Sequence, residues 1–130
     1  TADSILAGVE SHPERFGARL AATTIDTRGQ AVLRAQAAIR NGRPWWSAAA
    51  TGSAGTSGAA RCAAFGLMWA GDPQRAAYEA ALSTSVTHGH PVATSAAAAF
   101  AAAVALAANG DGPLDAAWLT AVGDICAEFN

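Results

Sequence analysis

The order of apolar and polar positions predicts helices along most of the chain, separated by short polar breaks. Residues 30–40 place their apolar side chains three and four positions apart, so that these side chains share one face of a helix. The Asn-Gly pair at 41–42 is a typical helix end. Asp72 followed by Pro73 combines an N-cap residue with proline in the first turn, and predicts a helix that reaches about residue 86.

Both ends of the chain carry similar signals. Ser11 and Glu14, with Pro13 between them, form a capping-box pattern for a helix that runs to about residue 22. Pro44 opens a short turn or helix that contains two tryptophans. Proline also opens the last predicted helix, at Pro113, and the apolar residues that follow recur at helical spacing: Leu114, Trp118, Val122 and Ile125.

Residues 92–108 form the longest apolar stretch, and it consists mainly of alanine. Alanine contributes little to membrane insertion, and the stretch is shorter than the roughly 20 strongly apolar residues that a membrane span needs. We therefore expect a buried core helix here, and no association with a membrane. The Asn-Gly pair at 109–110 ends it.

No stretch of the chain alternates β-branched and polar residues as a half-buried strand does. With 52% apolar residues and few bulky ones, the helices should pack closely through small side chains. The sequence predicts an all-α fold: residues 1–130 form a single segment, a compact, alanine-rich bundle of six or so helices.

Charge and cysteine usage exclude several classes of protein. The formal net charge is -2 and the arginines are scattered, so the chain has no basic stripe that would neutralise the phosphates of a nucleic acid. Cys62 and Cys126 lie in alanine-rich helical stretches without metal-ligand spacing, which predicts buried free thiols in a reducing compartment. The acidic N-terminal residues do not resemble an export signal, so we expect a cytoplasmic protein.

The glycine-serine stretch at residues 52–58 is the first candidate for chemistry. It is uncharged and flexible, and a helix is expected to begin near Ala59. Glycines allow backbone N–H groups to approach a ligand, and hydroxyls add further donors, so the stretch suits an anion such as a pyrophosphate. An ordinary connecting loop is the alternative. No lysine follows the stretch as it does in a phosphate-binding P-loop.

The second candidate is the break between two helices that contains His88 and His90. Two imidazoles can hold a metal, but one ion usually needs three or four protein ligands. A structural role for at least one histidine, capping the preceding helix or bonding to the backbone, is the alternative to a ligand contact. Weaker candidates are the two tryptophans, which stack on a base or pack against the core, and two acidic pairs on shared helix faces: Trp45 and Trp46, Asp111 and Asp115, Asp124 and Glu128.

The two breaks, in this order, resemble the middle of the ADP-ribosylglycohydrolase family. The family has the run Gly-Ser-x-Gly-Asn-Gly-Gly/Ala-Ala-Met-Arg, and this chain has Gly-Ser-Ala-Gly-Thr-Ser-Gly-Ala-Ala-Arg at 52–61. The family then has a helix ending in Thr-His, a proline and an alanine-rich helix, which correspond to residues 87–108. The resemblance spans about residues 20–130.

This resemblance implies an all-α fold and an enzyme that uses two magnesium or manganese ions. Its reaction is hydrolysis of the N- or O-glycosidic bond between ADP-ribose and a modified side chain, so the implied partner is ADP-ribose or an ADP-ribosylated protein. In the family the glycine-serine loop contacts the pyrophosphate and ribose, and the histidine helps to position the ribose. Carried over residue by residue, this implies ligand contacts at Gly52, Ser53, Gly55, Thr56 and His88.

The chain departs from the family pattern at the loop and at the metal motifs. Thr56 replaces the family's asparagine, Ser57 its following glycine and Ala60 its methionine. The early Asp-Asp-Thr and late Asp-x-Asp-Thr motifs are not found; Ile25 precedes Asp26 where the first acid should stand. We therefore predict that this chain alone hydrolyses no ADP-ribosyl bond.

Three hypotheses remain at this stage. The chain is the ADP-ribose-binding part of a glycohydrolase whose metal site is completed by the rest of a longer domain or by another copy of the chain. Alternatively, it is a non-catalytic module that binds ADP-ribose or another pyrophosphate, or it is a purely structural helical segment.

Overall fold

The computed structural model describes residues 13–25, 29–110 and 113–129. Within these ranges the chain forms seven α-helices and one short 3₁₀ helix, and no strand beyond an isolated β-bridge. The prediction of an all-α bundle is confirmed. The elements are α2 (Pro13–Ala22), α3 (Gln30–Arg40), η1 (Trp45–Ser47), α4 (Ser57–Ala60), α5 (Ala63–Met68), α6 (Pro73–Ser85), α7 (Pro91–Asn109) and α8 (Ala116–Ala127).

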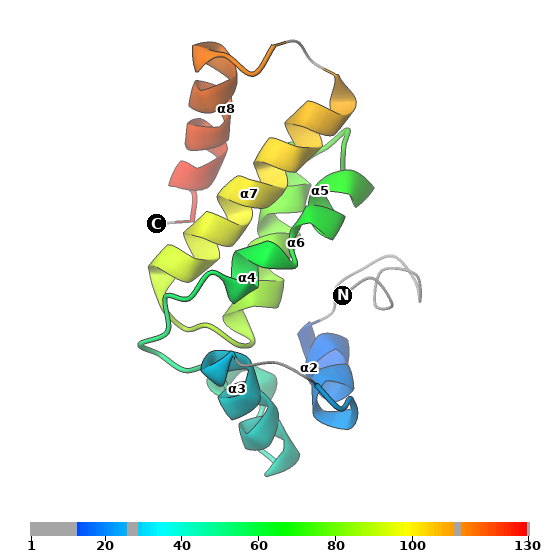
Figure 1. Cartoon of the computed structure of the whole chain (residues 1–130), viewed down its shortest axis with the longest axis vertical. Helices are drawn as coiled ribbons and strands as arrows, with labels where there is room; N and C mark the ends of the chain where they lie inside the picture. The colour runs from blue at the N-terminus through cyan, green and yellow to red at the C-terminus, as the bar shows by residue number, and fades with distance from the viewer. Residues whose placement is uncertain (1–12, 26–28, 111–112, 130) are drawn as a thin grey trace.

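The long helix α7 lies at the centre of the bundle, in contact with α4, α5, α6 and α8 (Figure 1). Two rows of alanines, each with a spacing of four residues, face different neighbours. One row packs with Cys62, Phe65 and alanines of α6, and the other packs with Ala77 and Ile125. Methyl-sized contacts of this kind let helix backbones approach closely. The two alanine rows are Ala97, Ala101 and Ala105, and Ala98 and Ala102.

Helix α5 approaches α7 most closely at Gly66, which is buried. A Cβ atom at this position would lie 2.5 Å from Cβ of Val104 and 2.6 Å from the carbonyl oxygen of Ala101. Real Cβ atoms essentially never come this close to other heavy atoms. The absence of a side chain at Gly66 is therefore what allows α5 to lie against the central helix.

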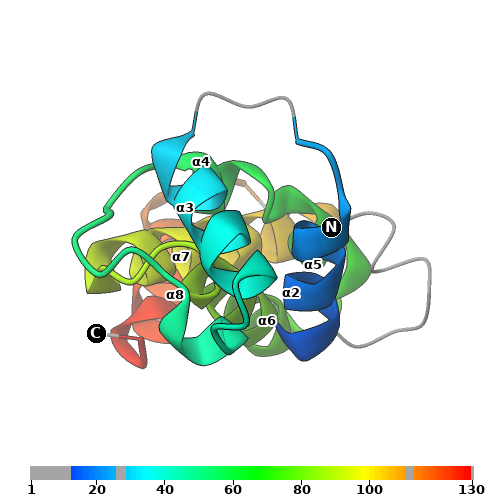
Figure 2. The same ribbon diagram turned by 90° about the horizontal axis from the view of Figure 1, so that it is seen from below.

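Helices α2 and α3 lie side by side across one end of the bundle (Figure 2). The buried side chain of Gln36 donates hydrogen bonds to the carbonyl oxygens of Leu20 and Thr23, at 2.7 and 2.6 Å. Arg40 donates to the carbonyl oxygen of Ala21 in the same turn. These bonds satisfy carbonyls at the end of α2 that have no partner within the helix. Val86, at the end of α6, packs against this helix pair.

Several predicted helix boundaries are confirmed. Helix α3 covers residues 30–40, and the Gly42 that follows it has a positive φ of 83°. Asp72 caps α6 by accepting a hydrogen bond of 2.9 Å from the backbone N–H of Arg75. Gly110 ends α7 in the left-handed conformation. The predicted capping residue Ser11 lies outside the described residues.

Two predicted helix starts are wrong. The helix after the loop begins at Ser57 rather than near Ala59, and it lasts one turn before a break separates it from α5. The break is tight because the N–H of Cys62 bonds three residues back, to Ala59. The last helix begins at Ala116 rather than at Pro113, because the Asp115 carboxylate accepts from two N–H groups of the first turn and fixes the start there.

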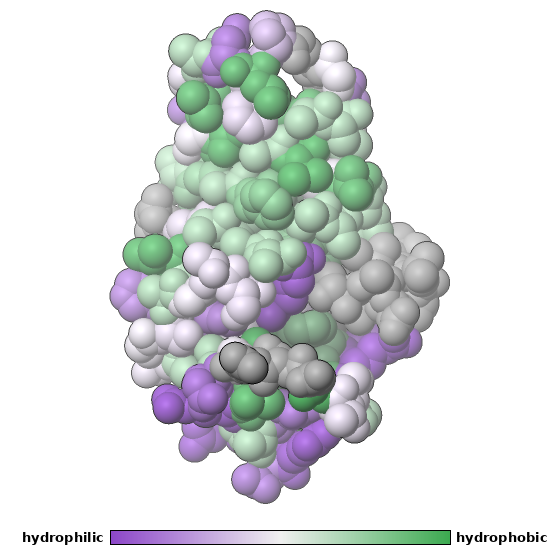
Figure 3. All heavy atoms as spheres, viewed as in Figure 1, coloured by the Kyte–Doolittle hydropathy of each residue, from purple (hydrophilic) through white to green (hydrophobic). Residues whose placement is uncertain are grey.

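Helix α7 is long and apolar enough to cross a membrane by length and composition alone, a criterion that core helices also meet. The expectation of a buried helix holds only for its alanine rows, since Val92 is 58% exposed and Phe100 43%. Figure 3 shows apolar residues over the half of the molecule built around α7, and hydrophilic residues over the end that carries α2 and α3. Both cysteines are free thiols, as predicted; Cys62 is buried, but Cys126 is only half-buried because α8 is fully buried only at Ile125.

Candidate functional site

The glycine-serine loop and the histidine segment are joined by their backbones. The N–H of Gly89 donates to the carbonyl oxygen of Ala50 at 3.0 Å, and Ala50 and His88 form a parallel β-bridge. A Cβ atom at Gly89 would lie 2.9 Å from Cα of Thr51, so the two segments touch at a residue without a side chain. In Figure 1 the loop before α4 and the turn between α6 and α7 lie together at one side of the bundle.

His88 lies against the loop, as the sequence predicted. The residue is 1% exposed, and its Nε2 is 3.7 Å from the position that a Cβ atom would take at Gly55. The same ring nitrogen lies 2.9 Å from Oγ of Ser57, and Nδ1 lies 2.7 Å from Oγ1 of Thr87. The ring is therefore held by a hydroxyl at each nitrogen. Its ring edge, Nε2 and Cδ2, faces the loop.

Arg61 supplies a positive charge directly behind His88. Its Nη2 donates to Oγ1 of Thr87 and to the carbonyl oxygen of Ser83, each at 2.8 Å, and its guanidinium lies 5.0 Å from the ring centre of Phe16. No carboxylate of the described residues forms an ion pair with it. Burial lowers the pKa of Arg61. Burial, followed by the charge of Arg61, lowers the pKa of His88, so the imidazole is neutral near pH 7.

The predicted ligand residues of the loop lie at the surface. Gly52, Gly55 and Thr56 are exposed and Ser53 is half-buried. Oγ of Ser53 lies 3.9 Å from the Cβ position of Gly55, so Ser53 and His88 both lie near this glycine. Thr56 precedes α4, but its side chain makes no capping hydrogen bond to that helix. All five predicted residues therefore lie in one region, although whether they bind a ligand stays a prediction.

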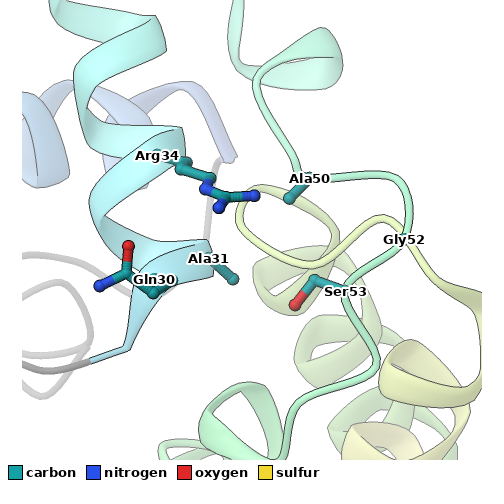
Figure 4. Close-up of a pocket in the computed structure, with 6 residues that line it drawn as sticks. All are labelled: Gln30, Ala31, Arg34, Ala50, Gly52 and Ser53. Carbon is teal, nitrogen blue, oxygen red and sulfur yellow. The ribbon is translucent and has the colours of Figure 1, made fainter.

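A cavity of about 340 Å³ adjoins the loop, between its first residues and the start of α3. It is lined by Gln30, Ala31 and Arg34 from the helix and by Ala50, Gly52 and Ser53 from the loop. Figure 4 shows Arg34 reaching from α3 toward Ala50, with the Ser53 hydroxyl facing α3 across the gap. Among the described residues that line it, one has a guanidinium and none is acidic, which suits an anion.

Four residues of this region were missed by the sequence prediction: Arg34, Ser57, Arg61 and Thr87. Arg34 is one of eight scattered arginines, and nothing in its surroundings in the sequence marks it. The side-chain bonds that link the other three to His88 or to each other join residues 26 or 31 positions apart, except for the adjacent pair Thr87 and His88. Ser57 occupies a position where the family has glycine, so the resemblance did not indicate its hydroxyl.

Of the remaining candidates, His90, Trp45 and Asp115 have structural roles. Nδ1 of His90 accepts from the N–H of Val92 at 3.2 Å, so this histidine caps the following helix, α7, rather than the preceding one. Because both nitrogens of His88 are engaged by hydroxyls, the histidine pair does not form a metal site. Trp45 packs in the core between α2 and α3, whereas Trp46 is 66% exposed. Asp115 is an N-cap, and Asp111 lies outside the described residues.

The described residues do not fit a pair of metal ions. Two-metal hydrolysis needs several carboxylates close together. Within 13–25, 29–110 and 113–129, no three His, Cys, Asp or Glu side chains come close enough to hold one ion. Asp26, which follows Ile25 where the family has its first acid, lies outside these ranges.

The lowered pKa of His88 predicts a loss of stability in mild acid. The unfolded chain takes up a proton near the ordinary pKa of about 6.5, before the folded protein does. The contribution of neutral His88 to the free energy of unfolding is therefore fully present above pH ~6.5. It is lost as the pH falls toward the lower pKa of the folded state. We expect urea unfolding at a series of pH values to show wild type losing stability relative to His88→Gln below pH ~6.5. Parallel curves for the two proteins would contradict this.

Comparison with known proteins gives one match. The model of a family described as ADP-ribosylglycohydrolase matches residues 1–128, which extends the resemblance seen in the sequence to the N-terminal residues. No curated protein and no solved structure matches the chain.

Proposed function

This chain belongs to the ADP-ribosylglycohydrolase family, and we propose that its loop and His88 bind the ADP-ribosyl group of a modified protein side chain. The observation that supports this proposal is the convergence of His88 on the loop, with Nε2 beneath Gly55 and 2.9 Å from Ser57. The backbone bridge at Ala50 holds the two segments together and turns the edge of the His88 ring toward the loop. In this proposal one ligand contacts both segments.

The chemistry of the region suits a diphosphate. Backbone N–H groups at Gly52 and Gly55 can approach a ligand without hindrance from a side chain, and Ser53 and Thr56 add hydroxyl donors. Arg34 brings a positive charge to the adjoining cavity, and guanidinium groups bind phosphate oxygens well. In this proposal the loop holds the pyrophosphate, and His88 lies where the ribose next to it would be.

Hydrolysis of the N- or O-glycosidic bond is the reaction proposed for the complete site. Because the described residues do not hold a metal pair, we propose that magnesium or manganese ligands come from the rest of a longer domain or from another copy of the chain. The exposed apolar residues on the half built around α7 offer a surface for such a partner. They include Leu67, Phe100, Leu114 and Leu119.

A non-catalytic module that binds ADP-ribose or another pyrophosphate is the second candidate. The misfit of the described residues to a metal pair favours it, since ligand binding requires only the loop, His88 and nearby positive charge. In the third hypothesis, a structural helical segment, ADP-ribose should not bind.

We expect ADP-ribose to bind the wild-type chain in a calorimetric titration, and Ser53→Ala combined with His88→Ala to weaken binding at least tenfold. Losing the Ser53 hydroxyl and the His88 ring contact should each weaken binding by on the order of 1 kcal/mol, and the two losses together exceed the factor of ten. Thr120→Ala is the control, because it removes an exposed hydroxyl from α8. Equal affinities for wild type and the double variant would remove the proposed site.

A hydrolysis assay tests whether the chain alone contains a complete catalytic site. The purified chain, supplied with magnesium or manganese and an ADP-ribosylated protein, should bind the substrate without releasing ADP-ribose. Release that depends on the metal would show that the chain contains a complete catalytic site.

A further inference from the structure

A chain of hydrogen bonds runs from the half-buried Arg61 to the exposed Ser57. Nη2 of Arg61 lies 2.8 Å from Oγ1 of Thr87, which lies 2.7 Å from Nδ1 of His88. Nε2 of His88 then lies 2.9 Å from Oγ of Ser57. Arg61 can only donate, so the first bond points away from it. The direction of the other two depends on where Thr87 places its single hydroxyl hydrogen.

The carbonyl oxygen of Thr84 competes with His88 for that hydrogen, at 3.3 Å from Oγ1 of Thr87. This oxygen already accepts the backbone N–H groups of Thr87 at 3.0 Å and His88 at 2.9 Å. Two bonds occupy both of its lone pairs. The Thr87 hydrogen therefore goes to Nδ1 of His88, which is also the closer acceptor.

The proton of neutral His88 must then be on Nε2, which donates to Oγ of Ser57. The Ser57 oxygen is used as an acceptor by this bond, and its own hydrogen is left to point away from His88. Ser57 is exposed and lies next to Thr56 in the loop. From Arg61 onward, each group therefore donates a hydrogen bond to the next, and the O–H of Ser57 is the last donor. Hydrogen bonds that follow one another in the same direction strengthen each other.

We propose that Ser57 binds a phosphoryl oxygen of the ligand through this directed donor. The identity of the ligand rests on the function proposed above, whereas the direction of the chain does not. An anionic oxygen is the acceptor that fits, because Arg61 has a half-buried positive charge, and no described carboxylate pairs with it. Thr87 and Arg61 are positioning residues in this arrangement, since they act through His88.

The direction of the chain can be tested without a ligand. Nitrogen-15 NMR of the histidine side chains distinguishes a protonated Nε2 from a protonated Nδ1. We expect His88 of the wild-type protein to carry its proton on Nε2. Thr87→Ser, which keeps the hydroxyl, should preserve this tautomer, and Thr87→Val should not. A proton on Nδ1 in wild type would reverse the last two bonds and overturn the proposal.

Titration with ADP-ribose and with ADP tests the contact itself. Ser57→Ala should weaken both ligands about tenfold, because the diphosphate is common to them and the acceptor is charged. Wild-type affinity for both in Ser57→Ala would overturn the contact while leaving the proposed function in place. A loss confined to ADP-ribose would assign Ser57 to the second ribose and overturn the phosphate assignment. If wild type binds neither ligand, the proposed function and this contact both fail, whatever tautomer the NMR spectra show.

Discussion

Replacing Gly66 with alanine should lower the free energy of unfolding by about 3 kcal/mol, the upper end of the usual range for overpacking. The new methyl group would lie 2.5 Å from Cβ of Val104 and 2.6 Å from the carbonyl oxygen of Ala101. The backbone of α7 fixes the positions of both atoms, so α5 would have to move away from the central helix. The gain in helix propensity, about 1 kcal/mol, is too small to compensate. Urea denaturation followed by circular dichroism measures the change.

Gly123 provides a matched control for this substitution. It lies within α8, is exposed, and has no heavy atom within 4 Å of the position of an added Cβ. Gly123→Ala should therefore stabilise the protein by up to about 1 kcal/mol through helix propensity alone. If the two variants changed stability by the same amount and in the same direction, the close contact between α5 and α7 would be wrong.

Replacing Gly58 with alanine should lower the stability by about 2 kcal/mol and also weaken ADP-ribose binding. Its Cβ would lie 2.5 Å from Cγ2 of Thr84, a fully buried and β-branched side chain of α6. To relieve this close contact, α4 has to shift. Because α4 contains Ser57, the shift would also disturb the 2.9 Å hydrogen bond between Ser57 and His88. Thermal unfolding and calorimetric titration of the same protein sample measure the two effects.

A second substitution tests whether the effects of Gly58→Ala come from the contact with Thr84 or from a general loss of structure. Thr84→Ser removes Cγ2 and keeps the hydroxyl, so it should restore much of the stability and affinity lost in Gly58→Ala. The two changes should couple by about 1 kcal/mol or more, as neighbouring residues do in a double-mutant cycle. Additive effects would contradict the contact.

Local signals predicted the helices whose ends depend on nearby residues. Helix α6 begins at Pro73 because Asp72 caps it, and α7 ends at Asn109 because Gly110 adopts a positive φ. The one-turn helix α4 could not be predicted in this way. Its position depends on the close approach of Gly58 to Thr84 of α6, a contact made only after the chain has folded.

For the candidate site too, the sequence predicted the residues but not the contacts between distant residues. The glycines and hydroxyls of the loop and the histidine in a helix break are visible in the sequence, and the family resemblance implied that Gly55 and His88 contact the same ligand. The hydrogen bonds that fix the state of His88 could not be predicted, because the bond from Ser57 spans 31 residues and the bond between Arg61 and Thr87 spans 26. Which arginine reaches the cavity also depended on where α3 lies.

The alanine rows of α7 determine which mutations this protein tolerates. In a core of large side chains, truncation is the costly change, because it leaves a cavity. At Ala97, Ala101 and Ala105 there is almost nothing to truncate, and nearly every substitution adds volume to a contact that is already closed. Among the folded variants obtained by random mutagenesis, we therefore expect only glycine or serine as replacements at these positions. Larger replacements should survive chiefly on the exposed side of the helix, around Val92 and Phe100.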